Sequence, residues 1–272
     1  MGPNSKSISD AFIAARKSAK GLDHYPGTLP ATLDEAYAIQ DASIAAWPDR
    51  VVGWKIGLVT PEYRASSGAE RLVGPIFSQL VHLARRGEIR PMPVFAEGFA
   101  AVEAEFVFCL GADVPADAPI DRDLALAVGG KLHVGVEIAS SPFSGINDFG
   151  PICVVSDFGN NHGLIVGPEI PGWHAIDWSS LDARVEIDGE LVGQTTADAI
   201  PGTPVGALEF ILHLMRRRGI ALKAGQYIST GAVTGVHSAP VGARSRVSFG
   251  RHGVIDLELT PALPLVMDAP QR

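Results

Sequence analysis

Two glutamates stand two residues apart in an otherwise apolar stretch, Ala101-Val-Glu-Ala-Glu-Phe-Val-Phe-Cys-Leu110. If this stretch is a β-strand, Glu103 and Glu105 project from the same face of the sheet, roughly 6–7 Å apart along the strand. Unpaired carboxylates are costly to bury, and two ionised carboxylates repel each other. The pair therefore predicts a positive group between them, and a hard divalent cation is the leading hypothesis.

A third acid, Glu137, lies in a second strand-like stretch, His133-Val-Gly-Val-Glu-Ile138. Three carboxylates and water can complete the octahedral oxygen coordination that Mg²⁺ or Mn²⁺ prefers. We therefore predict that Glu103, Glu105 and Glu137 bind one divalent cation. The spacing alone leaves an alternative open, which is a solvated strand face that carries these charges without a ligand.

One lysine has surroundings suited to proton transfer. Lys55 stands in the glycine-flanked stretch Gly53-Trp-Lys-Ile-Gly57. Apolar neighbours would desolvate its ammonium group and lower its pKa, which favours proton exchange near neutral pH. The alternative is a surface lysine whose hydrocarbon stem lies along apolar residues.

Two histidines lie near these stretches in the sequence. His162, in Asn160-Asn-His-Gly163, is either a ligand or proton shuttle, or a loop histidine that holds a turn. His133 shares a strand face with Glu137, and for it we expect a hydrogen-bonded supporting role or a place in the core.

The elements that must position these residues change in character along the chain. Apolar residues at helical spacing predict a first helix over residues 8–19. A capping box, Thr32-Leu-Asp-Glu35, opens a second helix that ends at Pro48. A strand is predicted over residues 51–58, and the proline-containing stretch 75–93 reads as a loop-rich transition. We place a boundary there, between an N-terminal helical and mixed portion, residues 1–75, and a β-rich catalytic domain, residues 76–272.

Strand patterns dominate after this boundary. They cover residues 95–110 and 131–138, the short apolar segments 152–155 and 164–166, and the later stretches 227–228, 245–249 and 254–259. Asp188-Gly189 predicts a type I′ hairpin turn. One helix interrupts the strands: Thr203 caps it, Pro204 suits its first turn and Gly219 closes it.

Composition excludes several classes of partner. The chain has 272 residues and a formal net charge of −8, which argues against nucleic acid or an anionic membrane as the main partner. Its two cysteines, Cys109 and Cys153, stand in apolar runs and are predicted to be free thiols. Without a long apolar stretch, a soluble cytoplasmic protein is expected.

An ordered set of motifs gives the chain a family resemblance. The set contains Gly53-Trp-Lys-Ile-Gly-Leu58, Gly74-Pro-Ile-Phe77, Val102-Glu-Ala-Glu-Phe106, Val136-Glu-Ile138, Ser156-Asp-Phe-Gly-Asn-Asn161 and Leu222-Lys-Ala-Gly-Gln-Tyr-Ile-Ser-Thr-Gly231. Together these motifs resemble the 2-keto-4-pentenoate hydratase and 4-oxalocrotonate decarboxylase branch of the fumarylacetoacetase superfamily. The resemblance spans roughly residues 35–260.

The resemblance implies an α+β fold, in which a mixed β-roll or sandwich core of the fumarylacetoacetase C-terminal type carries a smaller helical N-terminal portion. It implies Mg²⁺ or Mn²⁺ at the three acids, and it assigns proton transfer to Lys55. By motif position Gly57, Leu58 and Thr230 border a small 2-oxo or 2-hydroxy-dienoic acid. A homo-oligomer is also implied.

Two departures from the family pattern bear on the reaction. Many family hydratases carry an acid just before the glycine of their Asp-x-Gly-x-Leu segment, where this chain has Leu72-Val-Gly74. The stretch Glu137-Ile-Ala-Ser-Ser141 replaces the one typical of the hydrolase branch. We expect a hydratase acting in aromatic-compound catabolism; the alternatives are a 2-oxo dioate decarboxylase or a C–C hydrolase, and then a non-catalytic binding subunit.

Overall fold

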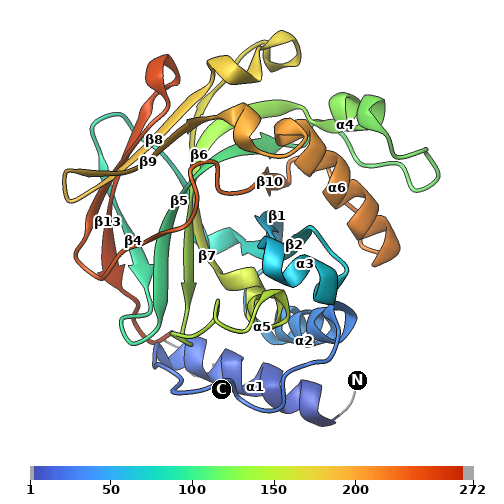
Figure 1. The fold of residues 1–272 in the computed structure, drawn as a ribbon, viewed down its shortest axis with the longest axis vertical. Coiled ribbons are helices and arrows are strands. Elements are labelled where there is room, and N and C mark those ends of the chain that lie inside the picture. The colour runs from blue at the N-terminus through green and yellow to red at the C-terminus, as the bar shows by residue number, and fades with distance from the viewer. Residues whose placement is uncertain (1–2, 266–272) are drawn as a thin grey trace, which may run out of the picture.

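Two β-sheets form the centre of the structure, a computed structural model that describes residues 3–265, and six α-helices lie around them (Figure 1). The larger sheet has the order β2 (Arg71–Phe77), β1 (Val51–Leu58), β10 (Tyr227–Ser229), β5 (Phe99–Cys109), β6 (Lys131–Ser141), β7 (Asn161–Glu169) and β3 (Val81–Leu83), with β11 (His237–Ser238) also paired to β5. The smaller sheet has the order β4 (Ile89–Val94), β13 (Val254–Pro261), β12 (Arg244–Ser248), β8 (Asp182–Ile187) and β9 (Glu190–Thr196).

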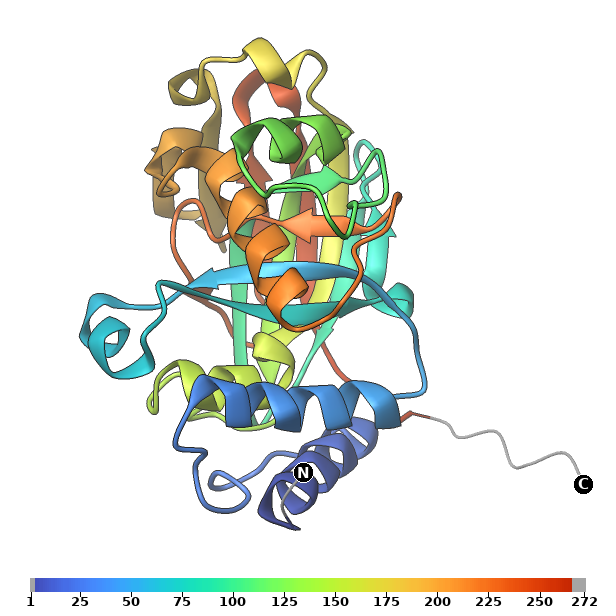
Figure 2. The ribbon, with the colours of Figure 1, turned by 90° about the vertical axis from the view of Figure 1, so that its right-hand side faces the viewer.

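The helices gather in two places outside the sheets. They are α1 (Pro3–Ser18), α2 (Leu33–Ala46), α3 (Pro61–Ser67), α4 (Arg122–Val128), α5 (Pro151–Ser156) and α6 (Thr203–Arg217). Figure 2 shows α1, α2 and α5 together at one end of the molecule, with α6 alongside the strands. Ile8 and Phe12 anchor α1 in the main hydrophobic core, which also holds residues of both sheets. No helix among residues 3–265 is long and apolar enough to cross a membrane.

The α+β fold with curled β-sheets confirms the predicted fold class. β1 and β2 belong to the expected N-terminal portion, yet they lie in the same sheet as β5, β6 and β10. The division at residue 75 stays a prediction.

Local signals predicted several elements correctly. Thr32 caps α2, because its side chain accepts a hydrogen bond from the Glu35 amide. Asp188 and Gly189 both have positive φ, as a type I′ turn between β8 and β9 requires. Cys109 and Cys153 are free, as expected.

Other expectations are wrong. The segment 152–155 is not a strand but the buried helix α5, because a short apolar run does not distinguish a strand from a buried helix. The stretch predicted as loop-rich, residues 75–93, contains the end of β2, all of β3 and most of β4. β2 tolerates Pro75 because it is an edge strand paired only with β1. Thr203 does not cap α6; Gly202 takes that position in the left-handed conformation.

Candidate active site

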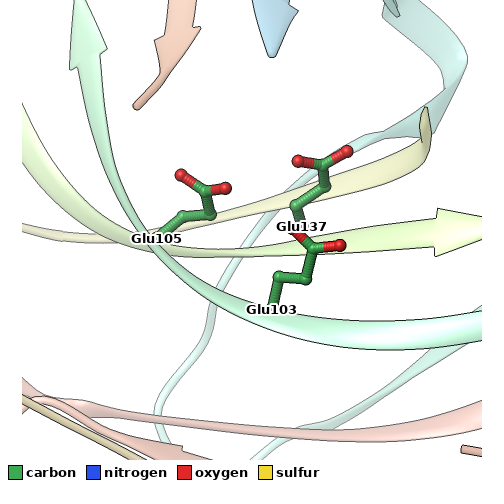
Figure 3. A group of neighbouring side chains, drawn as sticks. All are labelled: Glu103, Glu105 and Glu137. Atoms are coloured by element: carbon green, nitrogen blue, oxygen red, sulfur yellow. The ribbon is translucent and has the colours of Figure 1, made fainter. Parts of the chain in front are cut away.

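Two neighbouring strands bring three carboxylates together. Glu103 and Glu105 lie two residues apart on β5, and Glu137 on β6 is directly opposite Glu103 in the antiparallel register. One carboxylate oxygen from each residue lies within 4.8 Å of the others. Figure 3 shows the three side chains projecting to the same side of β5 and β6. The three acids that were predicted from the sequence therefore form one cluster.

Burial excludes the solvated strand face as an explanation for this cluster. Glu105 and Glu137 have no exposed surface, and Glu103 is 4% exposed. Within the part of the chain that the structure describes, Glu105 Oε1 and Glu137 Oε2 have no hydrogen-bond partner. Buried oxygens without partners are costly, and hard divalent cations bind carboxylate oxygens of this kind. The residues present thus fit Mg²⁺ or Mn²⁺.

Burial and mutual repulsion raise the pKa of two of the acids. Desolvation is the largest cause for Glu103, whose pKa rises to about 8, and the charge of Glu137 adds to it. Burial, then repulsion from Glu137 and Glu103, raises the pKa of Glu105 well above its usual value. The Gly231 amide, which donates to Glu105 Oε2 at 2.6 Å, opposes this rise. Negative charge therefore collects here at a free-energy cost that a cation would offset.

Lys55 reaches the cluster from β1. Its Nζ lies 3.3 Å from Glu137 Oε1, and the side chain is buried, which excludes the surface-lysine alternative. The expected lowering of its pKa is wrong. Burial by itself lowers the pKa of Lys55, but the attraction of the three carboxylates outweighs burial and raises it. The sequence neighbours of Lys55 do not include those carboxylates, so its local pattern predicts the opposite direction.

Two adjacent asparagines hold the lysine and one acid in place. Asn160 Oδ1 accepts a hydrogen bond from Lys55 Nζ at 2.9 Å. Asn161 Nδ2 donates to Glu137 Oε1 at 3.0 Å. Both asparagines are buried, so each hydrogen bond is shielded from water. This pair fixes the distance between the ammonium group and the carboxylate cluster.

The backbone that carries these asparagines is strained. Phe158, Gly159 and Asn160 all lie in the left-handed region, with φ of 55°, 60° and 56°. Such a conformation costs on the order of 1–3 kcal/mol for each non-glycine residue and persists only where packing enforces it. The packing comes from β2, whose Gly74 lies directly against this segment. A Cβ added to Gly74 would be only 2.0 Å from the Phe158 carbonyl oxygen, so a larger residue would not fit there. Gly74 thus lets two backbones meet beside the site.

A buried ion pair ties this segment to the first helix. Arg16 on α1 contacts Asp157 through two hydrogen bonds, Nε to Oδ1 at 2.5 Å and Nη2 to Oδ2 at 2.9 Å. Its Nη1 donates to the Asn161 carbonyl oxygen at 3.3 Å. Ser141 Oγ also donates to Asp157 Oδ2, at 2.6 Å. Arg16 therefore holds the segment that positions Asn160 and Asn161.

Replacing Arg16 with methionine is expected to lower the free energy of unfolding by about 3–5 kcal/mol, because it leaves the buried Asp157 carboxylate without its cation. Denaturant unfolding measures this loss. The matched control is Arg244→Met, which removes an ion pair with Glu258 from a side chain that is 68% exposed. The control is expected to lose less than about 1 kcal/mol. A similarly small loss for Arg16→Met would contradict the structural role of Arg16.

His162 belongs to this network and not to the carboxylate cluster. Its Nδ1 lies 3.3 Å from Arg16 Nη1, and its ring packs on Phe95 with centroids 4.5 Å apart. Burial, and then the charge of Arg16, lowers the pKa of His162 to about 3. His133, by contrast, places Nδ1 3.0 Å from the Gly167 carbonyl oxygen. Both histidines support the fold around the site.

His162 is expected to make stability depend on pH. Its folded-state pKa of about 3 lies below the ordinary value of 6.5, so the unfolded chain takes up this proton first as pH falls. The stabilisation is present above pH 6.5 and is lost progressively toward pH 3. Between pH 7.5 and 5, the free energy of unfolding should fall by about 2 kcal/mol more for the natural chain than for His162→Gln. Equal pH slopes in denaturant unfolding would contradict this.

A cavity of about 400 Å³ opens beside the cluster. Glu103 and Asn160 form its polar inner end, and Gly57 and Leu58, two of the predicted substrate-binding residues, also line it. Thr230 is buried, and its hydroxyl donates to the Phe106 carbonyl oxygen at 2.8 Å. Its role toward a substrate stays a prediction.

Sequence reasoning did not single out three of the contributors found here: Asn160, Asn161 and Arg16. Both asparagines were present in a motif of the resemblance, but nothing local indicated that they contact Lys55 and Glu137. Arg16 had a usable signal, since it stands four residues after the buried Phe12 and so on the apolar stripe of its helix.

The chain is similar in sequence to several known enzymes. No protein-family model matches the chain. The chain is 28% identical over 229 residues to a 2-keto-4-pentenoate hydratase of Paraburkholderia xenovorans (strain LB400), covering 83% of each chain. It is 29% identical over 201 residues to the enzyme of the same name from Paraburkholderia phymatum, covering 73% of this chain and 75% of that one. A 4-oxalocrotonate decarboxylase of Pseudomonas putida is 24% identical over 262 residues, covering 89% of this chain and 90% of that one.

Solved structures share the fold. The 4-oxalocrotonate decarboxylase from Pseudomonas putida G7, complexed with magnesium and adipate, superposes with a TM-score of 0.77 at 20% identity, covering 94% of this chain and 97% of that chain. Fumarylpyruvate hydrolase from Pseudomonas aeruginosa, in complex with Mn²⁺ and pyruvate, gives 0.58 at 14% identity over 79% of this chain and 91% of that chain. The chain therefore has the fold of these two enzymes. In sequence it is similar to 2-keto-4-pentenoate hydratases and 4-oxalocrotonate decarboxylases, the resemblance that the motifs predicted.

Proposed function

We propose that this chain is a metal-dependent hydratase, a lyase that adds water to a 2-hydroxy-2,4-dienoate and forms a 4-hydroxy-2-oxo acid in the catabolism of aromatic compounds. One observation carries the proposal: a buried cluster of three carboxylates with a buried lysine lies beside a cavity, and Glu103, one of the three acids, lines that cavity. The similarity to several enzymes named 2-keto-4-pentenoate hydratase supports this reaction over others of the superfamily.

The site residues divide into a metal-binding set and a proton-transfer set. Glu103, Glu105 and Glu137 would hold Mg²⁺ or Mn²⁺, which supplies a Lewis acid toward the carboxylate and 2-oxygen of the substrate. As an ammonium group, Lys55 Nζ would donate a proton to C5 of the diene and then take up the proton of the 2-hydroxyl oxygen, so that no net proton is gained or lost. Asn160 orients the ammonium group for this transfer through its 2.9 Å hydrogen bond. The product of the transfer is a 2-oxo-3-enoate, and water then adds at C4.

The cavity wall near Lys55 is apolar at one notable position. Leu72 pairs with Gly57 across β1 and β2. Both Leu72 and Lys55 lie close to Gly57: a Cβ added to this glycine would be 3.2 Å from Leu72 Cδ1 and 3.7 Å from Lys55 Nζ. The side chain of Leu72 thus occupies the place next to the lysine where many family hydratases carry an acid. Water addition in this chain must proceed without that acid, and we expect a lower rate of hydration as a result.

The direct test of the proposal is turnover of a dienoate. Purified protein with Mg²⁺ is expected to consume the ultraviolet absorbance of 2-hydroxypenta-2,4-dienoate without release of CO₂. A chelator is expected to stop the reaction, and added Mg²⁺ or Mn²⁺ to restore it. Release of CO₂ from a 2-oxo dioate together with an unchanged dienoate would contradict hydration. No turnover, with metal and 2-oxo acid binding retained, would indicate a binding subunit.

Decarboxylation of a 2-oxo dioate is the second candidate, and Leu72 is the observation that favours it. Loss of CO₂ places charge on the same 2-oxygen but needs no water, so a missing acid beside Lys55 would not slow it. The similarity to the 4-oxalocrotonate decarboxylases covers 89–91% of the chain, which also supports this alternative.

The assembly and location of the chain are part of the same proposal. We propose a homo-oligomer that works in the cytoplasm on a small acid, without nucleic acid or membrane as a partner. Exposed apolar side chains on and beside the sheets, such as Leu83 and Leu191, support association. Light scattering of the purified protein tests the oligomeric state, and a monomeric mass would contradict it.

A further inference from the structure

The cavity beside the cluster is closed by apolar side chains along most of its length. Leu72 and Val154 line it and are nearly buried, at 4% and 8% exposure. Leu58 and Val236 also line it and are 41% and 54% exposed, which places them at its mouth. Large apolar side chains exposed around a hollow are typical of a surface that binds an apolar ligand. The wall is polar at Glu103 and Asn160 and mostly apolar beyond them, and the exposed residues Thr60 and Asn147 add uncharged polar groups near the mouth.

Among the described residues, the cavity is lined by a single charged side chain, and it is negative. Among its lining residues within 3–265, Glu103 is the only charged one; Thr60, Tyr63, Asn147 and Asn160 are polar and uncharged. Tyr63 uses its hydroxyl to donate to the Asp148 carbonyl oxygen at 3.1 Å. Arg64 and Arg71 stand next to lining residues in the sequence, but neither lines the cavity: Arg64 donates Nε to the Val59 carbonyl oxygen at 2.9 Å, and Arg71 donates to the Pro201 carbonyl oxygen. A second carboxylate on a ligand would lose water here and gain no cation.

The volume of the cavity exceeds what a five-carbon acid needs. Its size of about 400 Å³ falls in the range of pockets that enclose drug-sized ligands, roughly 300–1,000 Å³. A divalent cation held by the cluster, together with Lys55, would attract the acid head of a ligand to the inner end. Space between Leu72 and the mouth at Leu58 and Val236 remains for a further group.

We propose that the substrate carries an uncharged hydrocarbon tail longer than that of a five-carbon dienoate, and that this tail lies against Leu72 and Val154 and extends to Leu58 and Val236. This inference rests on the proposed function for the position of the acid head. It assigns the chain to neutral-tailed dienoates and away from dioates. Uncharged apolar walls reject a charged end because the carboxylate would be desolvated without a partner.

Binding of unreactive 2-oxo acids tests the tail separately from turnover. Calorimetry of the Mg²⁺-loaded protein should show affinity rising about threefold per added methylene from 2-oxobutanoate to 2-oxooctanoate. The eight-carbon 2-oxo dioate should bind at least about tenfold more weakly than 2-oxooctanoate. Equal affinity along the series, or tighter binding of the dioate, would overturn the inference.

A charge placed at the mouth provides a second test. Val236→Arg, at an exposed position, is expected to improve binding of the dioate relative to 2-oxooctanoate by about tenfold. The matched control is Val254→Arg, which is also exposed but lies on β13 outside this cavity, and it should leave the ratio unchanged. An unchanged ratio in Val236→Arg would contradict the placement of the tail.

The two proposals fail in different ways. If no dienoate is hydrated but the binding order is as expected, the proposed reaction is wrong and the tail preference is supported. If dienoates of all tail lengths are hydrated with equal kcat/KM and the 2-oxo acids bind equally, the reaction stands and the tail preference is wrong.

Discussion

Glu103→Gln is expected to abolish uptake of Mg²⁺ or Mn²⁺ and to lower turnover by about 10³-fold or more, because a bound metal contributes several kcal/mol to stabilising charge on the substrate. The same change should stabilise the metal-free protein. The pKa of Glu103 rises to about 8 in the folded chain, so ionisation of this carboxyl opposes folding increasingly as pH rises from 4.5 toward 8. At pH 7 its removal should raise the free energy of unfolding by about 1–3 kcal/mol.

Glu103→Gln is thus expected to lose metal uptake and yet gain stability, and this combination distinguishes a metal ligand from a structural residue. If Glu103 only supported the fold, its replacement would lower the free energy of unfolding, and metal uptake would fall because the protein unfolds. The matched control is Glu190→Gln, an exposed glutamate on β9, which should change neither quantity. Calorimetric metal uptake by Glu103→Gln equal to that of the natural chain would contradict the assignment of this acid.

Lys55→Met is expected to lower kcat by about 10²–10⁴-fold while metal uptake persists. The substitution removes the ammonium group that lies 3.3 Å from Glu137 Oε1, so less positive charge opposes a cation at the cluster. Metal affinity should therefore be equal or higher. Without metal the variant should be less stable than the natural chain, because three buried carboxylates then lack a cation, and added Mg²⁺ should restore the stability.

Lys131→Met serves as the control for Lys55→Met. Lys131 pairs with Glu169 on the surface, and its side chain is 64% exposed, so turnover and metal uptake should not change. Retained turnover in Lys55→Met would remove this lysine from the mechanism. A loss of metal uptake would instead make it a structural partner of the cluster.

Alternation along a strand made two of the three carboxylates of the cluster predictable. Glu103 and Glu105 share a face wherever β5 forms, because side chains in a strand alternate with a period of two. The contribution of Glu137 depends on which residue of β6 stands opposite Glu103, and that register is a property of the whole sheet. The sequence offered Glu137 as a third ligand because it stands in a second strand-like stretch, and the family resemblance supported that choice.

The remaining features depend on packing between distant segments. Asn160 and Asn161 reach Lys55 and Glu137 because three consecutive left-handed residues redirect the chain, and no local pattern encodes that turn at Phe158. The direction of the pKa shift at Lys55 was missed for the same reason, since its cause lies on other strands. The apolar pattern of residues 152–155 predicts a strand, but these residues form helix α5, whose apolar side chains are buried by tertiary contacts and not by a sheet.

Metal uptake by the chelator-stripped protein is the most direct measurement of whether these buried acids form a metal centre. Isothermal titration calorimetry is expected to show one Mg²⁺ or Mn²⁺ bound per chain, and none after Glu103, Glu105 and Glu137 are all replaced with glutamine. Absence of binding to the natural chain, or binding that survives the triple replacement, would contradict the metal centre and the hydratase proposal built on it.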